Sequence, residues 1–337
     1  MRILLTGCAG FIGFHLTKKL LEQNIHITGI DNLNDYYDSS LKNKRLKEIE
    51  NFLEDPLAIG SFKFLRVSIE QESNLLESLS EKKFDVIINL AAQAGVRFSL
   101  NKPDEYINSN ILGFHNIMKI AKDLQVKHFI FASSSSVYGM NKANPFKEIH
   151  NTDHPVSLYA ATKKANEVLA FSYSHLHSIP TTGLRFFTVY GPFGRPDMAY
   201  YEFTRKILAG ETISLFNNGD MLRDFTYIDD VTESIARLIK KSPEKCSSHD
   251  SNASAPFRIL NIGNSNPVKL HTFIEEIESA LNKKAIVRNL PMQPGDVPIT
   301  FSDSQDLEEL IGYVPQTQIS TGIRNFTKWF RSFHGDI

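Results

Sequence analysis

The chain has 337 residues, of which 37 are Lys or Arg and 38 are Asp or Glu, so its formal net charge at pH 7 is −1. This balance gives no sign of a polyanion-binding surface, and nucleic acid is excluded as an expected partner. No apolar run approaches the roughly 18 residues that cross a bilayer, so no membrane span is predicted. The two cysteines, Cys8 and Cys246, are far apart in the sequence. We therefore predict no metal site, and a cytoplasmic protein, because sparse cysteine suits a reducing compartment.

Short apolar strands alternate with helices over roughly the first 187 residues. The pattern predicts strands at residues 2–6, 27–30, 62–67, 85–90, 127–132 and 181–187, and helices at 11–23, 41–53, 103–124 and 157–175. Buried strands that alternate with helices are typical of a doubly wound parallel sheet. The expected fold class is therefore α/β with a Rossmann-type sheet, in which ligands bind at the carboxyl ends of the strands.

The regular alternation stops beyond Tyr190, where residues 191–196 form a turn-rich loop. Shorter elements follow, and we expect a smaller, interleaved α/β domain that binds substrate. The predicted bounds are 1–189 with 225–263 for the first domain, and 190–224 with 264–337 for the second. Residues 242–256 contain five serines and little apolar content, so we expect an exposed loop there.

Three glycines, Gly7, Gly10 and Gly13, lie between the first predicted strand and the first predicted helix. Glycines at this place permit a tight turn, close approach of the backbone to a pyrophosphate, and close packing of helix on strand. The amides at the helix N-terminus bind the phosphates. Asp31 lies 18 residues beyond Gly13, at the end of the second strand. A carboxylate there accepts hydrogen bonds from an adenosine ribose and repels a 2′-phosphate, so NAD is expected rather than NADP.

Two further features accompany this predicted cofactor site. Leu90, Ala91 and Ala92 end the fourth strand and offer small side chains where the backbone passes close to the dinucleotide. Asn110 lies in a predicted helix, and two roles stay open for it: a plain surface amide, or a structural amide near the active site.

Tyr159 and Lys163 are four residues apart in a predicted helix, so their side chains share one face about a turn apart. A phenol with a pKa of about 10 is a poor base at neutral pH. A neighbouring ammonium and an oxidised nicotinamide both favour the phenolate. Such a phenolate removes a proton from a sugar hydroxyl while the carbon beneath gives hydride to the cofactor. Ser134, in the serine run after the fifth strand, would hold the same hydroxyl by a hydrogen bond.

These motifs resemble the extended short-chain dehydrogenases/reductases over nearly the whole chain. The resemblance rests on the glycine turn, on Ala91-Ala92, on the serine run before Val137-Tyr138-Gly139, and on Tyr159 with Lys163. Longer segments narrow it to the UDP-glucuronate 4-epimerases: residues 31–38 (DNLNDYYD), 91–97 (AAQAGVR), 185–191 (RFFTVYG), 194–198 (GRPDM) and 223–230 (RDFTYIDD). This family interconverts UDP-glucuronate and UDP-galacturonate with a tightly held NAD, through a 4-keto sugar that turns over between the two hydride transfers.

The resemblance also implies site residues. Catalysis would fall to Ser134, Tyr159 and Lys163. The implied NAD contacts are Gly7, Gly10, Phe11, Ile12, Gly13, Asp31, Asn32, Ser68, Ile69, Leu90, Ala91, Ala92, Asn110, Tyr159, Lys163, Phe186 and Val189. The implied contacts to the UDP-hexuronate are Arg97, Ser133, Ser134, Ser135, Tyr159, Thr188, Arg195, Phe216, Arg223 and Asp296.

Among the substrate contacts, Arg223 resembles the diphosphate-binding arginine, Phe216 the residue that packs the uracil, and Asp296 the residue that holds the uridine ribose. One residue departs from the pattern. Many relatives have an acid at the end of the third strand, whereas this chain has Ser68. The family also implies a homodimer, in which helices at about 103–124 and 157–176 pair across a two-fold axis. Apolar residues such as Ile111, Phe114 and Ile117 in one helix, and Leu169, Phe171 and Tyr173 in the other, are consistent with that pairing.

Two alternative functions stay open. A 4-keto uronate loses carbon dioxide readily, and the resemblance therefore includes UDP-glucuronate decarboxylases, with or without 4-epimerisation. Those relatives place Glu two residues before the Tyr of Val-Tyr-Gly, whereas this chain has the neutral pair Ser135-Ser136, which favours epimerisation. The other alternative is a non-catalytic NAD-binding protein, and the presence of both Tyr159 and Lys163 disfavours it.

Overall fold

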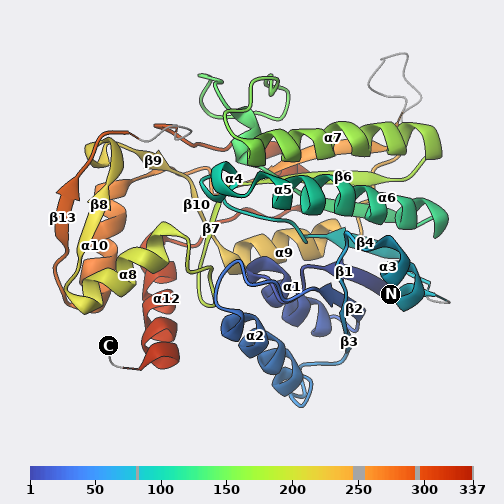
Figure 1. The fold of residues 1–337 in the computed structure, drawn as a ribbon, viewed down its shortest axis with the longest axis horizontal. Coiled ribbons are helices and arrows are strands. Elements are labelled where there is room, and N and C mark those ends of the chain that lie inside the picture. Colours follow the sequence, from blue (N-terminus) through green and yellow to red (C-terminus); the bar gives the residue numbers. More distant parts are fainter. Residues whose placement is uncertain (81–82, 246–254, 293–296, 336–337) are drawn as a thin grey trace. The chain divides into compact units, whose positions relative to one another are not determined.

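The computed structural model describes residues 1–80, 83–245, 255–292 and 297–335. Within these residues, seven strands form one sheet in the order β11-β6-β5-β4-β1-β2-β3 (Figure 1). The six strands from β3 to β6 pair in parallel, in the 3-2-1-4-5-6 order of dinucleotide-binding sheets. Their bounds are β1 Arg2–Thr6, β2 His26–Asp31, β3 Ser61–Arg66, β4 Val86–Asn89, β5 His128–Ser134, β6 Thr181–Phe186 and β11 Phe257–Ile262. The α/β fold class expected from the sequence is thus confirmed.

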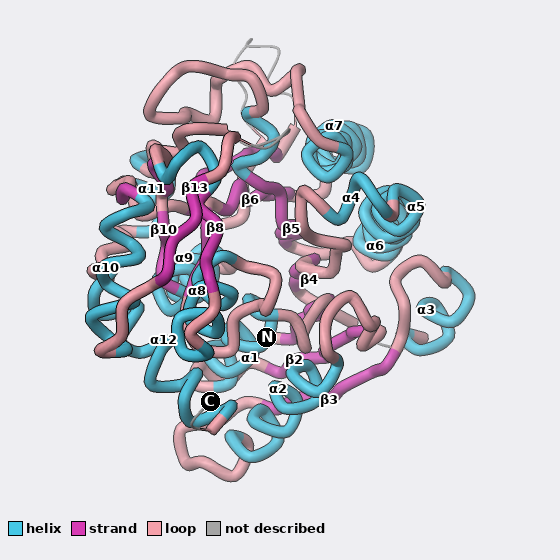
Figure 2. The backbone as a smooth tube through the Cα atoms, turned by 60° about the vertical axis from the view of Figure 1, so that its left-hand side comes forward, coloured by secondary structure: helices cyan, strands magenta, loops and turns pink. Residues whose placement is uncertain are grey.

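Helices cover both faces of this sheet. One face packs against α3 (Glu72–Leu79), α6 (Phe114–Asp123) and α7 (Leu158–His177), and Figure 2 shows α6 and α7 nearly end-on beside β4 and β5. The other face carries α1 (Phe11–Leu21), α2 (Ser39–Phe52) and α9 (Ile228–Leu238). Strands β4 and β6 are buried along their whole length, because helices keep water from both of their faces.

The core between the sheet and the α3–α6–α7 layer is a continuous apolar cluster. Phe114 and Ile117 of α6 pack there with Phe129 and Phe131 of β5, and all four side chains are at most 2% exposed. Burial of a Phe or Ile side chain stabilises a fold by about 1.5–3 kcal/mol. This cluster therefore fixes α6 and α7 on the strands whose ends carry the candidate site.

The helix predicted at residues 103–124 is present but is not a uniform α-helix. It comprises α5 (Pro103–Tyr106), a π-helical segment, η1, at Ile107–Gly113, and α6; a separate short helix, α4 (Phe98–Asn101), precedes it. The π-helical segment contains Asn110. Single π-turns occur often at functional sites, because the wider turn re-aims side chains that a regular helix would direct elsewhere.

The chain divides into two compact units. The first unit comprises residues 1–141, 151–186 and 232–260, and the second comprises 142–150, 187–231 and 261–337. The second unit takes in a short excursion, 142–150, within the segment that the sequence assigned to the first domain. Phe146 of that excursion explains why: its backbone pairs with Phe301 and Asp303, and its carbonyl accepts a hydrogen bond from the side-chain amide of Asn261. The loop expected at 242–256 includes residues 246–254, which lie outside the described residues.

The second unit is built from helices and two-stranded pairings. Its helices are α8 (Ala199–Ala209), α10 (Leu270–Leu281), α11 (Gln305–Ile311) and α12 (Ile319–His334). Its strands pair as β7 (Thr188–Tyr190) with β10 (Phe225–Tyr227), β9 (Leu222–Arg223) with β12 (Val268–Lys269), and β8 (Thr212–Leu215) with β13 (Ile286–Asn289). No helix among the described ranges is both long and apolar enough to cross a membrane.

A buried carboxylate connects three segments of the second unit. Asp224 is 0% exposed, and its two oxygens accept hydrogen bonds from the amides of Asn264 (2.8 Å), Ser265 (3.2 Å) and Ser302 (2.9 Å) and from the Ser302 hydroxyl (2.5 Å). Burial raises the pKa of Asp224, and these hydrogen bonds oppose that rise. The carboxylate is thus the common acceptor for donors of these segments, among them the fully buried Ser302.

We predict that Asp224→Asn lowers the apparent free energy of unfolding by about 3 kcal/mol, because an amide nitrogen replaces an acceptor and leaves buried donors unsatisfied. Chemical denaturation followed by circular dichroism measures the change. Asp220→Asn, at an exposed aspartate four residues earlier, should change it by no more than about 0.5 kcal/mol. Equal effects of the two substitutions would contradict the prediction.

Candidate active site

The glycine turn between β1 and α1 leaves no room for side chains. Gly7 has φ +72°, and a Cβ added there would lie 2.8 Å from the Ala91 amide nitrogen. A Cβ on Gly13 would lie 2.1 Å from the Gly7 carbonyl oxygen, and one on Gly10 would lie 2.9 Å from the same oxygen. Backbone amides at the start of α1 can therefore approach a ligand directly, as a pyrophosphate requires. The turn fits the cofactor predicted from the sequence.

Asp31 ends β2 beside this turn. Its side chain accepts hydrogen bonds from the amides of Ala9 (3.2 Å) and Leu33 (2.9 Å), and the residue is 9% exposed. Each carboxylate oxygen has further lone pairs, so these two bonds leave acceptor capacity for a ribose diol. The fixed negative charge is unfavourable for a 2′-phosphate.

Ser68, which the chain has where many relatives have an acid, forms hydrogen bonds to residues on both sides of it. The Asn32 side-chain amide donates to the Ser68 hydroxyl (3.1 Å), which in turn donates to the Glu70 carboxylate. An acid two residues beyond Ser68, Glu70, is thus connected to Asn32 through Ser68. We propose that Glu70 is a part of the adenosine end of the cofactor site, which the sequence alone did not indicate.

Asn110 connects the loop after β4 to α7. Its side-chain oxygen accepts from the Gln93 amide (2.8 Å), and its nitrogen donates to the Gln93 carbonyl (3.0 Å) and the Thr162 hydroxyl (3.0 Å). The backbone carbonyl of Asn110 accepts from the side-chain amide of Asn166 (2.6 Å). Both N–H donors of the side chain are used in this way. Of the two roles left open by the sequence, we therefore propose the structural one.

Most of the remaining candidate cofactor residues lie at strand ends or helix starts of the first unit. Leu90, Ala91 and Ala92 follow β4 and are half-buried, and the Ala91 amide donates to the Thr6 hydroxyl (3.1 Å). The others are Phe11 and Ile12 at the start of α1, Ile69 after β3, and Phe186 at the end of β6. Val189 belongs to β7 in the second unit.

Helix α7 carries Tyr159 and Lys163 on successive turns. Its first turn is capped by the Ser157 hydroxyl, which accepts from the Ala160 amide (3.1 Å). Tyr159 is half-buried, and its ring contacts that of Tyr106 edge-to-face at a centroid distance of 6.2 Å. Lys163 is 4% exposed, and its Nζ donates to the Ala132 carbonyl (2.9 Å) at the end of β5. Burial lowers the pKa of Lys163 to about 8.

The serine run turns sharply after β5. The Ser134 Oγ accepts from the Ser136 amide (3.1 Å) and caps a 3₁₀ turn, η2, at Ser135–Tyr138. Ser134 is 7% exposed, whereas Ser135 is half-buried. The cap satisfies one acceptor of Ser134 and leaves its hydroxyl proton to donate elsewhere.

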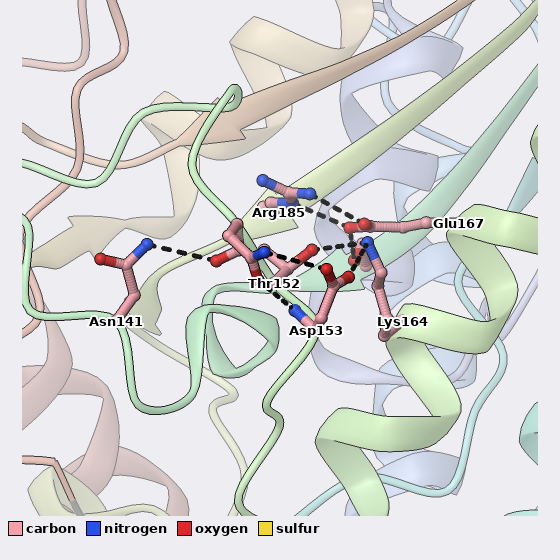
Figure 3. A network of polar contacts seen from close by, with 8 residues as sticks. Asn141, Thr152, Asp153, Lys164, Glu167 and Arg185 are labelled. Atoms are coloured by element: carbon pink, nitrogen blue, oxygen red, sulfur yellow. Dashed lines mark hydrogen bonds and ion pairs between the residues drawn. The ribbon is translucent and has the colours of Figure 1, made fainter.

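Ser133, expected to contact the sugar, has a different partner. It is 2% exposed, and its hydroxyl donates to Glu167 of α7 (2.6 Å), which also receives two hydrogen bonds from Arg185 of β6 (Figure 3). In the same view Lys164 donates to the Thr152 hydroxyl (2.6 Å). We therefore do not retain Ser133 as a proposed sugar contact.

The candidate substrate residues divide between the units. Arg97, in the first unit, is exposed. In the second unit, Arg223 of β9 donates through Nη1 to the Leu222 and Pro298 carbonyls (both 2.9 Å), and Arg195 pairs with Asp197 (3.0 and 2.7 Å). Phe216 and Thr188 are half-buried. Asp296 lies outside the described residues.

Three residues near these groups were missed by the sequence interpretation: Glu167, Arg185 and Glu70. A partial signal existed for Glu167, which follows Tyr159 and Lys163 at the same four-residue spacing. No such signal exists for its partner, because Arg185 meets Glu167 only through the packing of β6 beside β5. Among the described residues, no group of His, Cys, Asp or Glu side chains is arranged to hold a metal ion.

A glycine turn at the first strand, an acid ending the second and a Tyr/Lys pair on α7 define a dinucleotide-dependent enzyme that acts on a hydroxyl group. The chain belongs to the NAD dependent epimerase/dehydratase family, whose model matches residues 3–263.

Several proteins are similar to the chain over nearly its whole length, and some of them are named UDP-glucuronate 4-epimerases. It is 47% identical to Protein CapI of Staphylococcus aureus, over 99% of each chain. It is 44% identical to the probable UDP-glucuronate 4-epimerase of Rhizobium meliloti, over 98% of this chain and 97% of the relative. The crystal structure of UDP-glucuronic acid 4-epimerase from Bacillus cereus, in complex with UDP-glucuronic acid and NAD, superposes with a TM-score of 0.85 at 30% identity. That match covers 99% of this chain and 100% of the other.

The lowered pKa of Lys163 predicts how turnover depends on pH. The ammonium form is present below pH 8 and is lost as the pH rises through about 8. Because that charge favours the Tyr159 phenolate, kcat/KM should fall as the pH rises above about 8. In Lys163→Arg the guanidinium stays charged, so this basic limb should disappear even if the rate is lower. A pH–rate profile checks both expectations, and an unchanged limb in the arginine variant would assign it to another group.

Proposed function

We propose that the protein is an NAD-dependent UDP-glucuronate 4-epimerase that interconverts UDP-glucuronate and UDP-galacturonate through a transient 4-keto sugar. The observation that carries this proposal is the placement of Tyr159 on the same helix as a buried, carbonyl-bound Lys163, in a chain similar throughout its length to enzymes of that name. We further propose that it works in the cytoplasm, where a chain with sparse cysteine and a buried free Cys8 thiol remains reduced.

The residues of the first unit would divide the chemistry as follows. Tyr159 removes the proton of the C4 hydroxyl and later returns it to the ketone oxygen. Lys163 stabilises the phenolate, and Ser134 donates a hydrogen bond to the same sugar oxygen. NAD, when bound, supplies the acceptor and donor of hydride, so that no net oxidation results. Gly7, Gly10, Gly13 and Asp31 would hold it.

The second unit would supply most of the contacts to the nucleotide. A guanidinium binds a diphosphate through parallel hydrogen bonds, and we assign this role to Arg223. Phe216 is half-buried rather than a core residue, which leaves ring surface for the uracil. Thr188 and Arg195 would contact the hexuronate, and Asp296 the uridine ribose. We assign Ser135 to the hexuronate as well, and Arg97 to the phosphates.

The uncharged serine pair Ser135-Ser136 supports epimerisation over decarboxylation. Hydroxyl groups can hold the C5 carboxylate by hydrogen bonds without placing a second negative charge beside it. An acid at this place would repel the carboxylate and favour its loss from a 4-keto sugar. The 3₁₀ turn at Ser135–Tyr138 contains no acidic residue.

The direct test is the product formed from UDP-glucuronate. We expect UDP-galacturonate, with no release of carbon dioxide and no need for added NAD beyond that bound. A UDP-pentose would show a decarboxylase, and no product with bound NAD would show a non-catalytic protein. Resolving the sugar nucleotides by chromatography with mass spectrometry distinguishes the three.

Tyr159→Phe should lower kcat at least about a hundredfold while the fold and NAD content are retained, because it removes a positioned acid–base group. Tyr173→Phe is the matched control: Tyr173 is half-buried on the same helix, and its hydroxyl contacts His115 (3.3 Å). Near-normal turnover of the Tyr159 variant would remove this residue from the mechanism.

We also propose that the protein is a homodimer through its α4–α7 face, although the residues that support this differ from those expected. Phe114 and Ile117 fill the chain's own core and so say nothing about a partner. Large apolar side chains nevertheless remain exposed on α4, η1 and α7: Leu100 (69%), Ile107 (46%), Leu112 (46%), Val168 (58%) and Leu176 (68%). A second copy of the chain would cover them.

Light scattering at micromolar concentration should therefore give the mass of a dimer for the wild type. Leu112→Glu combined with Val168→Glu should give a monomer, because two carboxylates would be buried without partners. Leu57→Glu is the control, since the Leu57 side chain is at least as exposed (63%) as those of Leu112 and Val168 but follows α2, outside this face. A monomeric wild type would contradict the proposal.

A further inference from the structure

A fully buried ion pair lies behind the serine run. Glu167 of α7 and Arg185 of β6 have side chains that are 5% and 4% exposed. Arg185 donates from Nε to one carboxylate oxygen and from Nη2 to the other, both at 2.8 Å. This bidentate geometry fixes the plane of the guanidinium as well as its position. Burial alone would lower the pKa of Arg185, but the hydrogen bonds and the charge of Glu167 raise it overall.

The pair holds both ends of the segment that contains Ser134. On one side, Ser133 donates to the Glu167 carboxylate at 2.6 Å. On the other side, the Arg185 guanidinium lies 4.8 Å from the centre of the Tyr138 ring, at the end of the 3₁₀ turn. Ser134 and Ser135 lie between these two anchors.

The same helix holds the preceding residue. Lys163, one turn before Glu167, donates to the Ala132 carbonyl, so α7 binds two successive residues of β5. Tyr159, Lys163 and Glu167 follow one another at four-residue intervals and share one face of α7. The spacing between Tyr159 and the serine run is therefore set by contacts that Lys163 and Glu167 make.

Stability alone does not explain such a pair. Removing two charges from water is costly, and apolar side chains of similar size often stabilise a core as well or better. What an ion pair of fixed geometry provides is a defined arrangement of the elements it joins, here α7, β5 and β6. Proton transfer is sensitive to such arrangement, because a displacement of about 1 Å can slow it by about a hundredfold.

We propose that Glu167 and Arg185, acting through Ser133 and Tyr138, are positioning residues that hold Ser134 in register with Tyr159 for proton transfer. This inference rests on the proposed function. It assigns Ser133 to the supporting network instead of to the sugar. Its consequence is that the pair affects kcat and not the binding of substrate or NAD.

The test replaces both charges together, Glu167→Met with Arg185→Met, so that neither is left unpaired. We expect kcat at least about tenfold below the wild type, with KM within about threefold, NAD content unchanged and the melting temperature preserved. Ser133→Ala should slow the wild type but add nothing in the double variant, because the three residues act as a unit. A kcat within about threefold of the wild type, or full additivity of Ser133→Ala, overturns the proposal.

A second pair serves as the control. Arg205 and Glu211 also form a bidentate pair (2.9 and 2.8 Å), but in the second unit and with side chains 44% and 48% exposed. Arg205→Met with Glu211→Met should leave kcat unchanged. If the buried double variant does not fold, the single variants Ser133→Ala and Glu167→Asp test the proposal. A lower kcat at normal melting temperature supports it, and a normal kcat overturns it. All rates are ratios to the wild type on one substrate, so a wild type inactive on UDP-glucuronate contradicts the proposed function instead.

Discussion

The attachment of α7 to the end of β5 is the interaction on which the candidate site depends. An ammonium group with almost no access to water donates to the Ala132 carbonyl, and one turn later a carboxylate accepts from the Ser133 hydroxyl. Both contacts bind polar groups that would otherwise be buried without partners, so the helix cannot slide along the strand without large cost. The apolar cluster of Phe114, Phe129 and Phe131 brings the layers together, but the hydrophobic effect behind it is non-directional. Polar contacts of this kind are what bring Tyr159 and the serine run into one defined arrangement.

Burial has a second effect at the same place, on charge. An ammonium is less stable away from water, and the pKa of Lys163 falls to about 8 for that reason. With a pKa of about 8, the Lys163 ammonium is still charged at neutral pH and can stabilise a phenolate. Its hydrogen-bond partner is a carbonyl, so it is not held in an ion pair. Glu167 would be a competing partner one turn away, but its two oxygens are occupied by Arg185 and Ser133. Because Arg185 neutralises Glu167, Lys163 does not pair with Glu167 and can interact with Tyr159.

The sequence was sufficient for the sheet, the glycine turn and the Tyr159/Lys163 pair, because each depends on local pattern: apolar runs, backbone conformation open to glycine, and the pitch of a helix. It was insufficient where a role depends on a partner distant in the chain. Asn110 looks like a surface amide until η1 turns it toward Gln93 and Thr162. Ser133 and Ser134 are chemically identical neighbours, yet the alternation of a strand sends them to different partners. The excursion at 142–150 also depends on distant partners, since it groups with the second unit through its pairing with residues beyond 260.

The Glu167–Arg185 pair also bears on whether the proposed 4-keto sugar loses carbon dioxide. Decarboxylation requires the breaking carbon–carbon bond to stand perpendicular to the carbonyl plane, since the departing electrons enter the π system. A carboxylate held by neutral hydroxyls keeps its charge and its orientation, provided those hydroxyls themselves do not move. Ser135 follows directly on Ser134, in a turn whose beginning is held by the Ser134 cap and whose end lies against the Arg185 guanidinium. The buried ion pair would therefore restrain Ser135, the proposed carboxylate contact, as well as Ser134. On this view the choice between epimerisation and loss of carbon dioxide depends on the rigidity of one short turn as much as on which residues it contains.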